Sequence, residues 1–116
     1  MTIKRECEYT ECPVEAALDM IGGKWKSMLV AILMDEEQVR FNELQRRLKD
    51  VTHKVLTKQL RDLEECGLVR RKVHAEVPPR VEYSLTELGR TLEPVVAELK
   101  KWGTSFALKR GQTDEQ

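Results

Sequence analysis

The stretch THKVLTKQLRDLEEC (Thr52–Cys66), followed by VRRKVHAEVPPRVEYSL (Val69–Leu85), decides the fold of this 116-residue chain. In the first part, leucines recur with helical spacing at positions 56, 60 and 63, which predicts a helix with one buried side. In the second part, apolar residues alternate on both sides of Pro78-Pro79, which predicts two strands joined near the proline pair. Together the two parts predict a helix followed directly by a β-hairpin.

Positive charge is concentrated on the same two elements, although the formal net charge of the chain is zero. Residues 40–61 hold seven Lys and Arg against two acids, a net of +5, and residues 70–84 hold four against two, a net of +2. The acids Asp62, Glu64 and Glu65 fall late in the predicted helix, where we expect them to be solvated and to point away from phosphate. A local field of this kind attracts phosphate more strongly than the net charge suggests.

The residues just upstream predict a second helix and a short turn. Asn42 and Gln45 have the spacing of a capping box, so a helix is expected to begin at Asn42. Lys49-Asp50-Val51 then forms a three-residue connection, as between the helices of a helix-turn-helix. Thr52 is a suitable N-cap for the following helix, and Gly67 suits its end. We therefore predict a winged helix-turn-helix: a mainly α fold with a small β-hairpin, of the α+β class.

The predicted helix and hairpin supply the candidate contacts to double-stranded DNA, because a helix with exposed donors and acceptors fits the major groove. The candidates on the helix are Thr52, His53, Lys54, Thr57, Lys58 and Arg61. Arg80, beside the stiff proline pair, is the candidate for the minor groove. The candidates for phosphate contacts, which position the protein without reading sequence, are Arg46, Arg70, Arg71 and Lys72.

Apolar stripes near both ends of the chain predict a homodimer. Pro13 suits the first turn of a helix, and the apolar residues behind it include Val14, Leu18 and Ile21. Thr86 is expected to cap a long C-terminal helix, in which Pro94 should cause a kink or a local break. Its apolar residues are spaced by 4, 3, 4, 3 and 4 positions, as in a coiled-coil seam: Leu88, Leu92, Val95, Leu99, Trp102 and Phe106. Part of this stripe must cover the chain's own core, and we expect the rest to form a dimer interface with the N-terminal helix.

The length and composition predict one domain in a cytoplasmic protein. Residues 1–11 are expected to form a flexible arm, residues 12–108 the DNA-binding and dimerisation domain, and residues 109–116 a frayed tail. No apolar run approaches the ~20 residues of a membrane span, and the N-terminus lacks the apolar segment of a signal peptide. Three irregularly spaced cysteines do not indicate a secreted disulfide scaffold.

Other functional classes find little support in the sequence. It contains no Gly-rich phosphate loop and no Ser/His/Asp pattern, so neither an enzyme nor a cofactor is predicted. Cys7 and Cys12 have a C-x4-C spacing without a nearby histidine, so no metal site is predicted either, and a metal-responsive regulator is kept only as an alternative. A winged helix that binds other proteins is a second alternative. Such a module would have no affinity for duplex DNA, whereas the affinity of a DNA-binding protein for a duplex falls as the salt concentration rises.

Five sequence runs in order resemble the HxlR-type, MarR-like family of winged-helix transcriptional regulators. They are CPVEAALDMIGGKW, RFNELQRRL, VLTKQLRDLEECGLVRR, EVPPRVEYSLTELG and KKWG, and they extend from Cys12 to Gly103. The resemblance implies a bacterial regulator that binds palindromic operators as a homodimer. It does not distinguish a repressor from an activator.

The resemblance also implies a role for a cysteine just before the first helix, a position that Cys12 occupies. In several members this thiol senses oxidants or electrophiles. A helix N-terminus favours the thiolate, whereas Glu11 and Glu15 would oppose it, so both a sensing and a merely structural Cys12 remain open. Cys7 is a candidate resolving partner, or a disulfide partner across the dimer, and Cys66 is expected to be a small core residue. The alternative is a regulator with a non-redox small-molecule effector or none.

Overall fold

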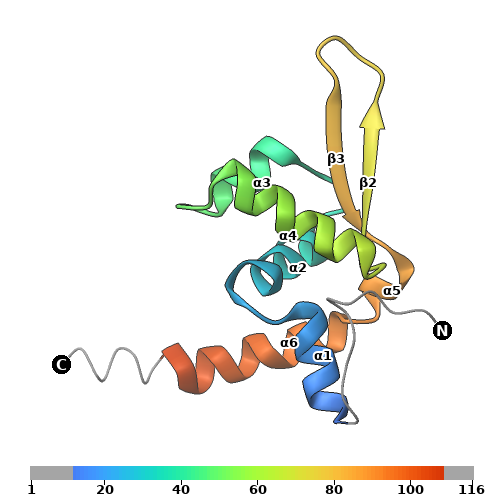
Figure 1. The fold of residues 1–116 in the computed structure, drawn as a ribbon. Helices are drawn as coiled ribbons and strands as arrows, with labels where there is room; N and C mark the ends of the chain where they lie inside the picture. Colours follow the sequence, from blue (N-terminus) through green and yellow to red (C-terminus); the bar gives the residue numbers. More distant parts are fainter. Residues whose placement is uncertain (1–11, 109–116) are drawn as a thin grey trace.

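The computed structural model describes residues 12–108 and forms a mainly helical fold with a small antiparallel sheet, which confirms the predicted α+β class (Figure 1). The predicted arm and tail, residues 1–11 and 109–116, lie outside the described residues. The elements in chain order are α1 (Pro13–Ile21), α2 (Lys24–Asp35), β1 (Val39–Arg40), α3 (Phe41–Arg47), α4 (His53–Glu65), β2 (Val69–His74), β3 (Arg80–Leu85), α5 (Glu87–Arg90), α6 (Glu93–Trp102) and a π-helical turn, η2 (Gly103–Ala107). None of the helices in the described range has both the length and the apolar character needed to cross a membrane.

The sheet has three strands in the order β1-β3-β2, one more than the predicted hairpin. In the hairpin, β2 and β3 pair from Val69↔Leu85 at its base to His74↔Arg80 near its tip. The added strand β1 pairs antiparallel with β3 through Val39↔Tyr83 and Arg40↔Glu82. A strand of two residues is too short to show an alternating pattern, so the sequence did not predict it.

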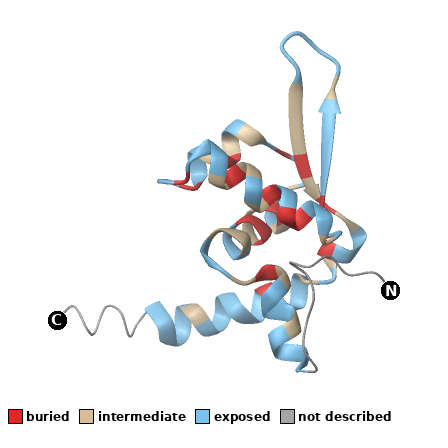
Figure 2. Ribbon diagram, viewed as in Figure 1, coloured by how far each residue is buried: buried red, intermediate tan, exposed pale blue. Residues whose placement is uncertain are grey.

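The core is built mainly from leucines on α2, α3 and α4, as the sparse aromatic content requires. The predicted buried leucines Leu56, Leu60 and Leu63 are at most 1% exposed, which confirms them, and Leu44 and Leu48 are fully buried beside them. Leu29 and Leu33 of α2 pack into the same cluster, and Leu85 closes it from the sheet. Figure 2 shows this buried layer between the exposed hairpin and the largely exposed α6.

The connection between α3 and α4 comprises residues 48–52, so it is two residues longer than predicted; the predicted Lys49-Asp50-Val51 lies between the cap residues Leu48 and Thr52. Asp50 has a φ of 72°, in the left-handed region that aspartate tolerates better than most residues. Thr52 caps α4 as predicted, because its Oγ1 accepts a hydrogen bond from the Val55 amide at 3.1 Å. The predicted capping box at Asn42 is wrong: α3 begins at Phe41, and its N-cap residue Arg40 makes no side-chain cap hydrogen bond. The pairing of Arg40 with β3 fixes this boundary instead.

The predicted single long C-terminal helix is also wrong. Thr86 does cap a helix, accepting from the Gly89 amide, but α5 ends at Arg90 and α6 starts at Glu93. Pro94 lies in the first turn of α6, where its missing amide removes no intrahelical hydrogen bond. The expected kink is therefore a boundary between two helices, and this explains how proline is accommodated.

Candidate nucleic-acid interface

Helix α4 exposes one side along its length while burying the other. Leu56, Leu60 and Leu63 are buried against the core, and Lys54, Lys58 and Arg61 are exposed. The base of the hairpin follows α4 directly, and β2 and β3 rise from it together (Figure 1). The structure thus places the basic side of the predicted helix in solvent, with the hairpin beside it.

The N-terminal turn of α4 is held by short-range contacts. Thr52 serves as its N-cap, and the exposed His53 ring packs against Phe41 with ring centroids 4.7 Å apart. Thr57 is half-buried, whereas Lys54 is exposed and makes no hydrogen bond or ion pair with another described residue. The first turn therefore presents a fixed imidazole beside an unpaired ammonium group.

Lys58 is held by an acid on its own helix. Its Nζ donates to Asp62 Oδ2 at 3.1 Å, and Lys26 Nζ of α2 lies 3.6 Å from the same oxygen. The Asp62 side chain is only 9% exposed, so the expectation of a solvated carboxylate is wrong at this position. Burial of a charge is tolerated here because two ammonium groups pair with it.

A hollow of about 720 Å³ separates α4 from the hairpin. Four arginines line it: Arg61 of α4, Arg71 of β2, Arg80 of β3 and Arg40 of β1. The buried Tyr83 contributes to its wall, and burial raises the pKa of the phenol although the Arg71 guanidinium beside it acts in the opposite direction. The surrounding guanidinium groups make the hollow electrostatically suited to an anionic backbone.

Arg80 is engaged with acids of the hairpin in this structure. Its Nη1 lies 3.2 Å from Glu76 Oε2 and its Nε 3.4 Å from Glu82 Oε2, and its side chain is 29% exposed. The hydrogen bond from His74, 2.8 Å away, lowers the pKa of Glu82, so that carboxylate is charged at neutral pH. A minor-groove contact by Arg80 therefore requires these ion pairs to open. The apolar Val77 is fully exposed beside it at the hairpin tip.

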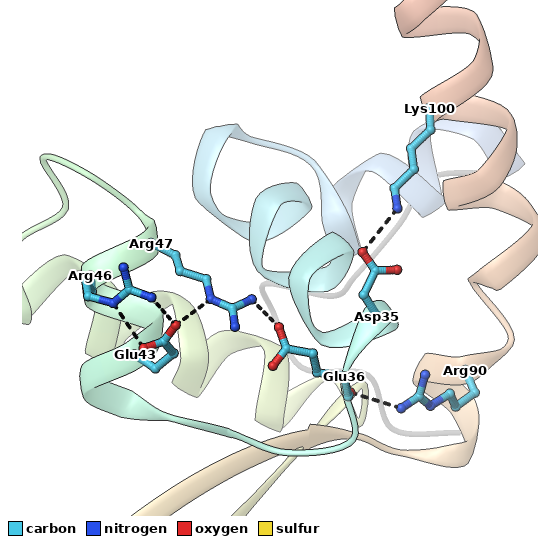
Figure 3. Close-up of polar contacts among 7 residues, drawn as sticks. All are labelled: Asp35, Glu36, Glu43, Arg46, Arg47, Arg90 and Lys100. Carbon is cyan, nitrogen blue, oxygen red and sulfur yellow. Dashed lines mark hydrogen bonds and ion pairs between the residues drawn. The ribbon is translucent and has the colours of Figure 1, made fainter.

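The remaining residues predicted to contact phosphate differ in whether they already form ion pairs. Arg70, Arg71 and Lys72 are exposed on β2. Arg46 is exposed but bound to Glu43 within α3, and its neighbour Arg47 pairs with both Glu43 and Glu36 (Figure 3). Arg46 must therefore break its ion pair with Glu43 before it can contact a phosphate.

The same close-up shows how the end of α2 is tied to three other helices (Figure 3). Arg90 of α5 donates to the backbone oxygens of Met34 and Glu36, and Lys100 of α6 lies 3.5 Å from Asp35. Arg47 of α3 completes the group through Glu36. These contacts fix the helix-turn-helix relative to the C-terminal helices.

The pKa of Glu43 predicts a measurable pH dependence of stability. Hydrogen bonds from Arg46 and Arg47 lower this pKa from 4.5 to about 2. Because the folded pKa lies below the unfolded one, the stabilisation is present above about pH 5 and is lost as pH falls toward 2. We expect Glu43→Gln to flatten the decrease of thermal stability over this range, measured by circular dichroism. An unchanged pH profile in the variant would show that Glu43 contributes nothing to it.

Helices α1 and α6 lie at the end of the molecule opposite the hairpin tip (Figure 1), and these helices with the following turn η2 carry an exposed apolar face. Its members are 44–67% exposed: Val14, Leu18, Val95, Leu99, Trp102 and Phe106. Two residues predicted for the dimer interface do not belong to it, because Ile21 is buried at 6% exposure and Leu92 is half-buried against the core. The Trp102 and Phe106 rings pack against each other with centroids 5.6 Å apart. The predicted seam thus contains both core residues and an uncovered face.

The cysteines occupy different positions. Cys12 is exposed at the N-cap of α1, directly before Pro13. Cys66, at the C-cap of α4, is half-buried and packs against the core as expected, and it is also disulfide-bonded, which the sequence did not predict. Cys7 lies outside the described residues. Within residues 12–108, no three His, Cys, Asp or Glu side chains are grouped to hold a metal ion.

Sequence reasoning did not identify Arg40 and Lys26 as parts of this region. Arg40 belongs to the hollow only because β1 pairs with β3, and no local pattern shows that pairing. Lys26 lies in the polar first turn of α2, before its apolar run begins, and its proximity to Asp62 depends on how α2 packs on α4. No local pattern in the sequence shows that contact.

An exposed basic helix after a helix and a tight turn, followed by a basic hairpin, defines a winged helix-turn-helix that binds DNA. The HxlR-like helix-turn-helix family model matches residues 20–110. The chain therefore belongs to the HxlR-like helix-turn-helix family, whose members are transcriptional regulators rather than enzymes.

Relatives of known sequence or structure agree with this assignment. The HTH-type transcriptional regulators YdeP and YybR of Bacillus subtilis (strain 168) are 50% and 55% identical to this chain, covering 85% and 81% of it and 77% and 74% of their own lengths. The reduced form of the redox regulator HypR superposes with a TM-score of 0.79 at 51% identity, covering 85% of this chain and 99% of that chain. Reduced YodB from B. subtilis gives a TM-score of 0.71 at 34% identity, covering 84% and 95%.

Proposed function

We propose that this regulator acts as a homodimer on a palindromic operator, with the N-terminal half of α4 in the major groove. The main support for this proposal is the position of two surfaces. One is the exposed basic face on α4 and the hairpin, and the other is the uncovered apolar face at the other end of the molecule. A chain that presents DNA at one end and a second copy at the other can bind two half-sites on one duplex. Half-sites about one helical turn apart, or a multiple, match this arrangement.

Within this proposal, α4 reads sequence and the hairpin positions the protein. Thr52, His53, Lys54, Thr57, Lys58 and Arg61 project from α4 and the turn before it toward base edges and adjoining phosphates. Arg71 and Lys72 on β2 contact phosphates, which adds affinity without discrimination. Arg80 reaches the minor groove only after leaving Glu76 and Glu82, so its contribution depends on how strongly the groove attracts it.

The different roles proposed for α4 and the hairpin predict two kinds of mutational effect. We expect Lys58→Ala and Thr57→Ala to weaken operator binding and to change sequence preference, by about 1–3 kcal/mol where a base contact is lost. Arg71→Ala should weaken all duplexes nearly equally and reduce the log–log salt slope by about 0.9. Fluorescence anisotropy on a duplex selected from a random pool, and on its scrambled version, measures both. Equal losses on both duplexes from all three variants would contradict the assignment of reading to α4.

We further propose that Cys12 makes the regulator responsive to oxidants or electrophiles. Its support is positional: Cys12 is exposed at the start of α1, two residues before Val14 of the apolar face. Chemistry at this point would act directly on the proposed interface. The similar proteins HypR and YodB are respectively a redox regulator and a regulator solved after diamide treatment.

Cys12→Ser tests this response directly. We expect diamide or a quinone to change operator affinity of the wild type and to leave the Cys12→Ser variant unaffected, in a gel shift run beside a non-reducing gel. A Cys12→Ser variant that still responds to diamide would exclude Cys12 as the sensor. A wild type that ignores both reagents would favour a non-redox effector or none.

A further inference from the structure

Asp62 is the buried charged residue of the described chain, and it holds a lysine that we assign to DNA. Its Oδ2 receives a hydrogen bond from Lys58 at 3.1 Å and lies 3.6 Å from Lys26. The Lys58 side chain remains 65% exposed, whereas that of Lys26 is 13% exposed. One ammonium group is therefore a fixed internal partner, and the other is a partner that solvent can reach.

The contact also determines where Lys58 points. Long side chains on a helix normally lean toward its N-terminus. Lys58 instead reaches one turn toward the C-terminus to meet Asp62, away from the half of α4 that we place in the groove. The acid thus withdraws a positive charge from the proposed interface while the protein is unbound.

Lys26 makes this withdrawal reversible. If Lys58 moves to DNA, Asp62 still has the Lys26 ammonium beside it and is not left as an isolated buried charge. The cluster holds two positive charges and one negative charge, so one positive charge is available for release. Lys58 therefore leaves Asp62 only where its interaction with DNA is stronger than its interaction with Asp62.

We propose that Asp62 is a positioning residue that limits affinity for DNA, because it competes with phosphate and with base acceptors for the Lys58 ammonium group. On the operator, a base acceptor in register outweighs Asp62 and Lys58 moves to it. On other sequences a phosphate alone does not, so this lysine releases no counterion. The inference rests on the proposed DNA-reading role of α4 and adds to it a residue that lowers affinity for DNA.

The test compares Asp62→Asn with Glu65→Gln. Both remove one negative charge from α4, but Glu65 is exposed and makes no ion pair with a described residue. We expect Asp62→Asn to raise affinity for a scrambled duplex about fivefold and to steepen its log–log salt slope by about 0.9, as one added phosphate contact requires. Affinity for the duplex selected by the wild type should rise by at least as much, because binding there no longer breaks the Lys58–Asp62 ion pair. Glu65→Gln should leave the slope unchanged.

A Lys58→Gln background separates this role from a structural one. There, Asp62→Asn should no longer alter the salt slope, because the lysine that it releases is absent. Equal behaviour of Asp62→Asn and Glu65→Gln, or an affinity loss on both duplexes without a change of slope, would overturn the inference. A wild type without affinity for any duplex would instead refute the proposed function, and this inference with it.

A second variant covers a failure of Asp62→Asn to fold, since that change leaves Lys26 without its carboxylate. Lys26→Met combined with Asp62→Asn removes both buried charges and releases Lys58 equally. We expect the same fivefold gain on the scrambled duplex and the same steeper slope. A folded double variant that binds the scrambled duplex like the wild type would overturn the inference.

Discussion

Gly89→Ala is expected to destabilise the fold by about 3 kcal/mol, because a methyl group has no room at this position. A Cβ on Gly89 would lie 2.3 Å from the backbone oxygen of Leu68 and 3.0 Å from Leu85 Cδ2. The Leu68 oxygen cannot move away cheaply, since it accepts a hydrogen bond from the Thr86 amide at 3.0 Å. The backbone must shift where β3 enters α5. Thermal denaturation should show a loss of roughly 10–20 °C.

Gly103→Ala is the matched control for this prediction. Gly103 has helical dihedrals of −61° and −45°, and a Cβ there meets no atom within 4 Å. Alanine should therefore leave stability unchanged or raise it by about 0.5–1 kcal/mol, since it loses less conformational freedom on folding than glycine. If Gly89→Ala and Gly103→Ala had the same melting temperature, the close approach of α5 to Leu68 would not be the reason for glycine at position 89.

Leu99→Glu is expected to abolish dimerisation and, with it, tight operator binding. Leu99 is 57% exposed in the single chain, so a carboxylate there should leave the fold intact. In a twofold dimer the change occurs twice, losing apolar burial in both copies and adding two charges to one interface. A cost of about 3 kcal/mol corresponds to about a 100-fold weaker dimer. Analytical ultracentrifugation and a gel shift on the selected duplex would measure both effects.

Ala97→Glu provides the control for Leu99→Glu. Ala97 is exposed on α6 but lies on the other side of the helix from Val95, Leu99 and Trp102. It adds the same charge without touching the apolar face, so the dimer should persist. If Leu99→Glu stayed dimeric at the same concentration, this face would not be the interface.

Much of the DNA-facing half of the fold was predictable because its signals are local. The leucine spacing of residues 56–63 determined which side of α4 is buried, and the position of Thr52 determined where that helix begins. The proline pair located the bend of the hairpin. Each of these features depends on neighbours within one or two helical turns or across one tight turn, so the linear chain contains the information.

Errors arose where a distant segment changed a local preference. The capping box at Asn42 was a valid local pattern, but pairing of β1 with β3 placed the N-cap of α3 two residues earlier, at Arg40. The continuous seam from Leu88 to Phe106 was a valid helical pattern, but the chain turns at Thr91 and Leu92 so that α5 can pack beside β3. In both places tertiary contacts outweighed a weak propensity.

The sequence by itself determined the family, the helix-turn-helix with its hairpin, and the basic side of α4, because periodicity and spacing are properties of the linear chain. Only the tertiary structure decided which charges are free. Asp62 meets Lys26 from another helix, and Asp35 of α2 meets Lys100 of α6. The strength of an ion pair depends on the distance between its charges and on their burial. Both are set by packing between elements that are far apart along the chain.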